Sequence, residues 1–127
     1  MARYLSIVER PYRATVEEQD DTALWFTHMI KNAGGEMSAL LRSNATNYAV
    51  RGQDASGLRF GHAALSVPPT LDKDVEELIK KGVPVYVVRE DLDDRGIRIA
   101  DLVPGVEAIS RQDVARLFDE HDQIWHW

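Results

Sequence analysis

The stretch KKGVPVYVVREDLDDRGIRIADLVPGVE, residues 80–107, decides the fold of this chain. A glycine closes a helix near its start, and residues 83–88 then form a run of β-branched and aromatic side chains. This composition is typical of a strand that is buried on both faces. Three charged residues follow the run directly. Because ligands of open parallel sheets bind beyond the carboxyl ends of the strands, a functional site is expected at this point.

The composition is that of a globular protein with a single domain over residues 1–127. Hydrophobic residues make up 44% of the chain and charged residues 28%. No apolar run approaches the roughly 20 residues that a membrane-spanning helix needs. The first residues lead directly into a strand-like segment without the pattern of a signal peptide. We therefore expect a cytoplasmic protein with no membrane association.

Charge and cysteine content exclude several classes of function. The formal net charge is -6, which argues against nonspecific binding to DNA or to anionic membranes. The chain contains no cysteine, so disulfides, zinc–thiolate sites, thiol nucleophiles and persulfide carriers are all excluded.

The remaining segments alternate between strand and helix patterns. A capping box at Thr15-Val16-Glu17-Glu18 predicts the start of the first helix, and Gly34-Gly35 predicts its end. Residues 53–61 are polar and rich in glycine, which is typical of a loop. The predicted strands cover residues 3–9, 36–42, 62–67, 83–88 and 106–109. Strands that alternate with helices favour a three-layer α/β/α fold with a mostly parallel sheet of about five strands.

The motifs K-G-V-P-V-Y-V, D-L-x-x-R-G-I and L-V-P-G-V-E within residues 80–107 resemble the DsrE/DsrF/DsrH-like family of sulfur-relay proteins, which includes TusB, TusC and TusD. The resemblance extends upstream to residues 40–44 and 48–52. The charged segment after the strand and the D-E-H-D-x-x-W ending are most similar to the DsrH/TusB pattern. The resemblance implies a Rossmann-like fold, a homo-oligomer (dimer, trimer or hexamer) and a DsrE-like partner protein in sulfur relay.

The chain departs from this family at one point. DsrE-type members carry a reactive cysteine near the loop after the strand, where this sequence has Val88-Arg89-Glu90-Asp91. A persulfide carrier needs a thiolate sulfur. The resemblance therefore implies an accessory or ligand-binding protein of sulfur-relay type that is not itself the carrier. The alternative is a small-molecule-binding enzyme or sensor with an Arg/Asn/Asp pocket at the strand ends.

Polar residues cluster near three predicted strand ends that a parallel sheet would bring together. Their guanidinium, amide and hydroxyl groups are suited to an anionic small molecule. The alternative interpretation is solvated loop charge, which is common for such residues. The candidate ligand-binding residues are Arg10, Tyr12, Arg42, Asn44, Asn47, Arg89 and Asp91.

The remaining motifs give weaker evidence for a function. The four histidines lack the spacing of a metal site, and neither the dinucleotide-binding fingerprint nor the P-loop is present, so we expect no metal and no cofactor. Glu90 and Asp91 could form an acid/base pair, but exposed loop carboxylates are the commoner case. The aromatic rings of Trp125 and Trp127 at the end of the sequence favour a subunit interface or the lid of an inter-subunit pocket, with a free tail as the alternative.

Overall fold

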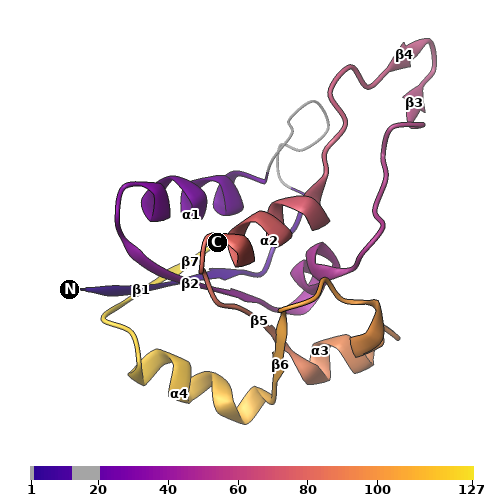
Figure 1. Ribbon diagram of the computed structural model, residues 1–127. Coiled ribbons are helices and arrows are strands. Elements are labelled where there is room, and N and C mark those ends of the chain that lie inside the picture. The colour runs from indigo at the N-terminus through magenta and orange to yellow at the C-terminus, as the bar shows by residue number, and fades with distance from the viewer. Residues whose placement is uncertain (1, 13–20) are drawn as a thin grey trace.

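The computed structural model describes residues 2–12 and 21–127 and shows an α/β fold with a five-stranded sheet at its centre (Figure 1). The order across the sheet is β6-β5-β2-β1-β7, and all neighbouring strands are parallel. The predicted fold class is confirmed. The strands are β1 (Arg3–Val8), β2 (Glu36–Leu41), β5 (Val85–Val88), β6 (Glu107–Ile109) and β7 (Gln123–His126).

Helices cover both faces of the sheet. The α-helices are α1 (Thr22–Asn32), α2 (Leu71–Lys80), α3 (Arg89–Asp94) and α4 (Val114–Asp119). Three short 3₁₀ helices are η1 (Ser43–Ala49), η2 (Ile99–Asp101) and η3 (Arg111–Asp113). In Figure 1, α1 and α2 lie above the sheet and α4 lies below it. None of the described helices is long and apolar enough to cross a membrane.

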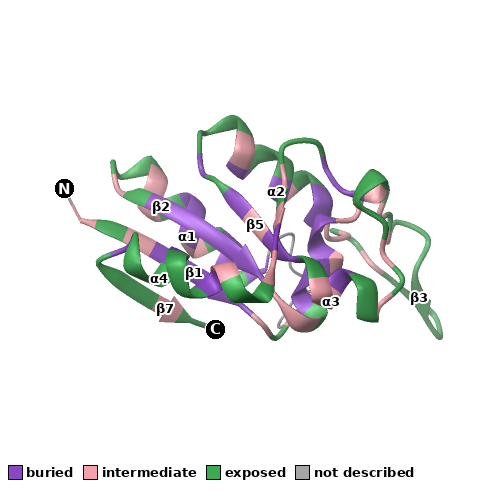
Figure 2. Ribbon diagram, turned by 90° about the horizontal axis from the view of Figure 1, so that it is seen from below, coloured by how far each residue is buried: buried purple, intermediate pink, exposed green. Residues whose placement is uncertain are grey.

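The core forms two layers because side chains alternate between the faces of each strand. On the α4 face, Leu5 and Ile7 of β1 pack with Leu117 of α4. On the opposite face, Val8 and Leu41 belong to the larger cluster that α1 and α2 cover. Figure 2 shows that burial is concentrated in β2 and in parts of the strands beside it.

The start of α1 is set by Asp21, whose carboxylate accepts hydrogen bonds from the N–H groups of Ala23 and Leu24 at 2.8 and 3.3 Å. Such a cap satisfies N–H groups that have no partner within the helix. The capping box predicted at Thr15-Val16-Glu17-Glu18 lies outside the described residues. The predicted end of the helix agrees with the structure, since Gly34 follows α1 with a φ of +94°.

The strand predicted at residues 62–67 is not part of the central sheet. Instead, β3 (Arg59–Phe60) and β4 (Ala63–Ala64) form an antiparallel hairpin that projects from the body of the molecule (Figure 1). Gly61 at its turn has a φ of +64°, which a glycine adopts readily. This segment offers no large buried side chain, whereas β2 and β5 pair directly with each other. The prediction was wrong because composition alone did not show which strands are neighbours.

The fifth strand of the sheet is β7, which was not predicted as a strand. It pairs with β1, with Ile7 opposite His126. The charged segment after β5 also differs from the prediction of a loop, because α3 begins at Arg89. Its first turn carries Glu90 and Asp91, and acidic residues are favoured there by the helix dipole. The carboxyl ends of β1, β2 and β5 therefore converge next to a helix N-terminus.

Candidate functional site at the carboxyl ends of the strands

The alternation of side chains decides which strand-end residues can meet. Glu9 follows β1 on the same face as Leu5 and Ile7, and Arg42 follows β2 on the same face as Leu40. The parallel register pairs Val8 with Leu41, so Glu9 and Arg42 continue as cross-strand neighbours. Both side chains are thus directed to the α4 side of the sheet.

A cavity of about 450 Å³ lies at this point. One part of its wall is polar and comes from the ends of β1 and β2 and from α3 and η3. The other part is apolar and comes from β5 and α4. The lining residues are Glu9, Arg42, Ser43, Val88, Asp91, Arg111, Val114, Ala115 and Phe118.

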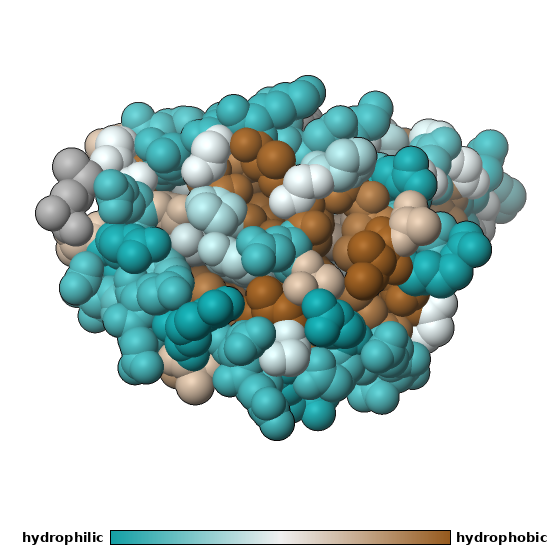
Figure 3. Space-filling model, turned by 60° about the horizontal axis from the view of Figure 1, so that its bottom comes forward, coloured by the Kyte–Doolittle hydropathy of each residue, from teal (hydrophilic) through white to brown (hydrophobic). Residues whose placement is uncertain are grey.

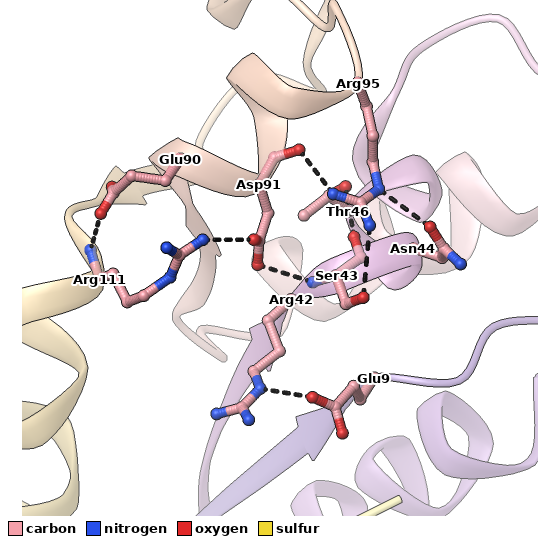
Figure 4. A network of polar contacts seen from close by, with 9 residues as sticks. All are labelled: Glu9, Arg42, Ser43, Asn44, Thr46, Glu90, Asp91, Arg95 and Arg111. Carbon is pink, nitrogen blue, oxygen red and sulfur yellow. Dashed lines mark hydrogen bonds and ion pairs between the residues drawn. The ribbon is translucent and has the colours of Figure 1, made fainter.

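Asp91 connects three segments at the cavity. One carboxylate oxygen accepts the backbone N–H of Ser43 at 2.7 Å, and the other accepts Nη2 of Arg111 at 2.9 Å (Figure 4). Its side chain is only 14% exposed, so these charge-assisted bonds are partly shielded from water. Glu90 adds a bond from its carboxylate to the backbone N–H of Arg111 at 2.7 Å. The first turn of α3 therefore positions both the end of β2 and the segment after β6.

Ser43 has an unusual backbone conformation, with a φ of +55°. Non-glycine residues rarely occupy this left-handed region, and such strain occurs often at functional sites. Its N–H donates to Asp91, and its carbonyl oxygen accepts the hydroxyl of Thr46 at 2.9 Å. Its hydroxyl lies 3.3 Å from Nη2 of Arg95. These three contacts, with Asp91, Thr46 and Arg95, hold the sharp turn from β2 into η1.

Glu9 sits between two basic side chains. Its Oε1 accepts Nε of Arg42 at 3.0 Å, and its Oε2 lies 2.9 Å from Nε2 of His126. The hydrogen bond from Arg42 is the main reason that the pKa of the Glu9 carboxyl lies below its ordinary value of 4.5. Glu9 is therefore an anion at neutral pH and holds the Nε side of Arg42.

The two arginines of the cavity keep unused donors. Among the described residues, the side chain of Arg42 makes a hydrogen bond only through Nε, and the side chain of Arg111 only through Nη2. Figure 4 shows the Nη atoms of Arg42 without a contact to any other drawn residue. Guanidinium groups bind carboxylates, phosphates and sulfur oxyanions through such N–H pairs. The chemistry of this arrangement is anion binding.

Two of the predicted ligand-binding residues, Arg42 and Asp91, line this cavity together. Asn44 and Asn47 do not. Asn44 accepts Nε of Arg95 at 3.0 Å, and Asn47 donates to the carbonyl oxygen of Asn44 at 2.9 Å. Arg89 is directed to β6, where its Nη2 donates to the carbonyl oxygen of Ala108 at 3.2 Å. In the described structure these three side chains contact protein groups.

Arg10 and Tyr12 lie elsewhere. The backbone N–H of Arg10 approaches the carbonyl oxygen of Trp127 at 3.5 Å. Tyr12 lines a different cavity of about 320 Å³ at the base of the hairpin arm, next to Leu58 and Phe60. Its backbone N–H donates to the hydroxyl of Tyr48. The predicted cluster is thus divided between separate parts of the surface.

Three polar residues of the cavity were not predicted, namely Glu9, Ser43 and Arg111. The predicted first strand, residues 3–9, includes Glu9. A rule that takes the first two residues after each predicted strand finds Ser43 and Arg111, and it finds Glu9 as well only when β1 ends at Val8, as in the structure. Arg111 follows β6 by two positions and reaches the site because β6 is the neighbour of β5.

Three of the four histidines, His28, His121 and His126, contact other protein groups. His121 is buried, with Nε2 at 3.0 Å from the hydroxyl of Ser38 and Nδ1 at 2.6 Å from the carbonyl oxygen of Leu117. Within residues 2–12 and 21–127, no group of three or more His, Cys, Asp or Glu side chains is arranged to hold a metal ion.

The C-terminal tryptophans pack on their own chain. The ring of Trp125 stacks on Tyr4 at a centroid distance of 4.9 Å, and Trp127 meets Phe26 at 5.7 Å. Nε1 of Trp127 donates to the hydroxyl of buried Ser6 at 3.0 Å. Both tryptophans are partly exposed, so part of each ring remains at the surface of β7.

Comparisons with known proteins identify the fold. Models of protein families and curated proteins yielded no match to the sequence. Among solved structures, the chain is similar to the YchN protein from E. coli, with a TM-score of 0.76, 20% identity and coverage of 100% of both chains. It is also similar to a protein of unknown function from Methanobacterium thermoautotrophicum, with a TM-score of 0.62, 20% identity and coverage of 98% of this chain and 99% of the other.

A third similar structure is a conserved protein of unknown function from Bacteroides thetaiotaomicron. Its TM-score is 0.65 at 12% identity, with coverage of 98% of this chain and 94% of the other. At these identities the likeness concerns the fold alone. The chain therefore has the same architecture as these three solved structures.

Proposed function

We propose that this chain is a DsrE-like accessory protein that binds a small anion in the strand-end cavity and does not itself carry a persulfide. The proposal rests on one observation: Arg42 and Arg111 line the same cavity, and each side chain has N–H donors without a hydrogen-bond partner among the described residues. Hydrogen bonds from a guanidinium to an anion are among the stronger polar contacts in proteins.

Glu9 and Asp91 support binding rather than oppose it. Each carboxylate engages one side of one arginine, at 3.0 and 2.9 Å. This contact restricts the rotamers of a long side chain before a ligand arrives, which lowers the entropy lost on binding. The remaining donors are then available to a ligand without the full cost of ordering the side chain.

The absence of cysteine supports the accessory role. The chain has no cysteine, so it offers no thiolate that could accept and release sulfur. Where the family resemblance expects the reactive residue, α3 begins, and Arg89 and Glu90 bind backbone groups of β6 and η3. We further propose a homo-oligomer that works beside a cysteine-bearing DsrE-like partner. Co-purification of such a partner from native lysate tests this part.

Calorimetry with thiosulfate as the probe tests the anion site. In Arg42→Met the side chain keeps much of its apolar stem and loses its donors. We expect its dissociation constant to rise about 10- to 100-fold, which corresponds to the loss of a charge-assisted bond of roughly 1.5 to 3 kcal/mol. The matched control is Arg98→Met, because Arg98 is 78% exposed and pairs with Asp101 outside the cavity. Equal affinities of wild type and Arg42→Met would contradict the proposal.

The alternative function is an enzyme or sensor that uses the same pocket, and the conformation of Ser43 favours it. A strained residue whose N–H donates to Asp91 and whose hydroxyl accepts from Arg95 is the kind of position where reactive or signalling groups are held. Native mass spectrometry of the purified protein distinguishes the two functions. Because both functions include a bound anion, the partner protein is the deciding observation. A bound cysteine-bearing protein supports the accessory role, whereas a retained small molecule without any partner protein supports the sensor or enzyme.

A further inference from the structure

The strand-end cavity has an apolar side that a simple inorganic anion would not use. Val88 of β5 and Val114, Ala115 and Phe118 of α4 line it opposite the polar residues. Figure 3 shows hydrophobic surface between hydrophilic side chains on the side of the molecule that includes α4. The wall therefore combines a polar part with a hydrophobic part.

Phe118 is the largest apolar side chain of this wall. It is 40% exposed, whereas its neighbour Leu117 is 1% exposed and belongs to the core under α4. Ala115 and Phe118 are three positions apart and so lie on one side of the helix. α4 thus uses one side for the core and presents another side, with an aromatic ring, to the cavity.

We propose that the ligand is an organic anion, with a sulfonate, carboxylate or phosphate head at Arg42 and Arg111 and an apolar or aromatic body against Phe118. This inference rests on the proposed anion-binding function. A cavity of about 450 Å³ is larger than a small inorganic ion requires and lies in the range of small-molecule sites. Burial of an apolar body adds affinity that the guanidinium groups alone do not supply.

Two probes with the same head test this inference by calorimetry. Benzenesulfonate and methanesulfonate are both monoanions and differ only in the phenyl or methyl group. We expect benzenesulfonate to bind about tenfold more tightly or better, since covering one aromatic ring contributes roughly the 1.4 kcal/mol that corresponds to a factor of ten.

Two variants then test whether the difference in affinity between the two sulfonates arises in the cavity. Phe118→Ala is expected to lower the affinity for benzenesulfonate much more than the affinity for methanesulfonate, which removes most of the preference. Phe60→Ala is the matched control, because Phe60 is 61% exposed on the hairpin arm and does not line the cavity. Circular dichroism of each variant shows whether the fold is retained.

The outcomes separate this inference from the function on which it rests. If the two sulfonates bind with equal affinity and Arg42→Met abolishes the binding of both, the proposal of an organic ligand is wrong, while the proposal of an anion site stands. Sulfonate binding that Arg42→Met does not change would overturn the anion site itself. A preference for benzenesulfonate that persists in Phe118→Ala would overturn the assignment of the apolar body to α4.

Discussion

The hydroxyl of Tyr48 donates a hydrogen bond of 2.5 Å to Oδ2 of Asp21, and both side chains are buried. The same hydroxyl accepts the backbone N–H of Tyr12. Burial, followed by the hydrogen bond to Asp21, raises the pKa of the Tyr48 phenol far above its ordinary value. Because Asp21 also caps α1, this pair ties η1 to the start of the first described helix.

We expect Tyr48→Phe to lower the free energy of unfolding by about 2 to 3 kcal/mol. The substitution leaves a carboxylate oxygen that is buried without its donor, and lost bonds to charged groups cost this amount. Urea unfolding measures the change. Tyr86→Phe is the control, because no hydrogen bond involves its hydroxyl among the described residues. Similar losses in both variants would contradict the role of the Tyr48–Asp21 bond.

The lowered pKa of the Glu9 carboxyl predicts that the stability of the fold decreases at acidic pH. Its pKa is lowered in the folded protein, chiefly by the bond from Arg42, so its carboxylate stabilises the fold above pH 4.5. This contribution is lost as the pH falls through the lower, folded-state pKa. We expect Glu9→Gln to be less stable than wild type at neutral pH and to lose less stability on acidification to about pH 3. Parallel acid profiles of the two proteins in thermal unfolding would be evidence against this coupling.

Asp91 is expected to support stability more than its position near the surface suggests. Asp91→Asn removes the charge that holds the Ser43 N–H and the Arg111 guanidinium, and we expect a loss of about 2 kcal/mol in the free energy of unfolding. Asp93→Asn makes the same change on the exposed side of α3 and is expected to cost less than about 0.5 kcal/mol. Equal unfolding midpoints of Asp91→Asn and Asp93→Asn in denaturant would contradict this prediction.

Trp125 is expected to serve both the core and an interface. Trp125→Ala removes the ring that stacks on Tyr4 and contacts Phe26, and we expect a loss of about 2 kcal/mol for a partly buried ring. Trp25→Ala, at a position that is 47% exposed on α1, is the control. Light scattering tests the proposed interface, for which a shift to smaller species is expected. An unchanged mass would restrict Trp125 to its own core.

Local patterns predicted the central part of the fold well. The run of valines in residues 83–88 contains β5, which covers Val85–Val88. Ser110 caps η3 by accepting the N–H of Asp113 at 3.3 Å. Gly82 and Gly96 end helices with φ values of +82° and +65°. These features depend on residues close together in the chain, so the sequence alone reveals them.

The site was predicted only in part, for a physical reason. The rule that ligands bind beyond the carboxyl ends of strands correctly brought Arg42 and Asp91 together. The rule does not say to which face each side chain turns. Alternation along the strands sends Glu9 and Arg42 to the α4 side, while Tyr12 lies at the hairpin arm. Residues from one edge of the sheet therefore occupy different cavities.

The sequence by itself determined the alternation of strands and helices, the buried strand at residues 83–88 and the absence of a thiol. Only the tertiary structure decided that β7 lies beside β1, that the hairpin stands outside the sheet, and that Arg42 and Arg111 share a cavity. The reason is that strand pairing and strand-end contacts join distant residues. Glu9 and Arg42 are 33 positions apart, and Asp91 and Arg111 are 20 apart. No local pattern of side chains specifies such partners.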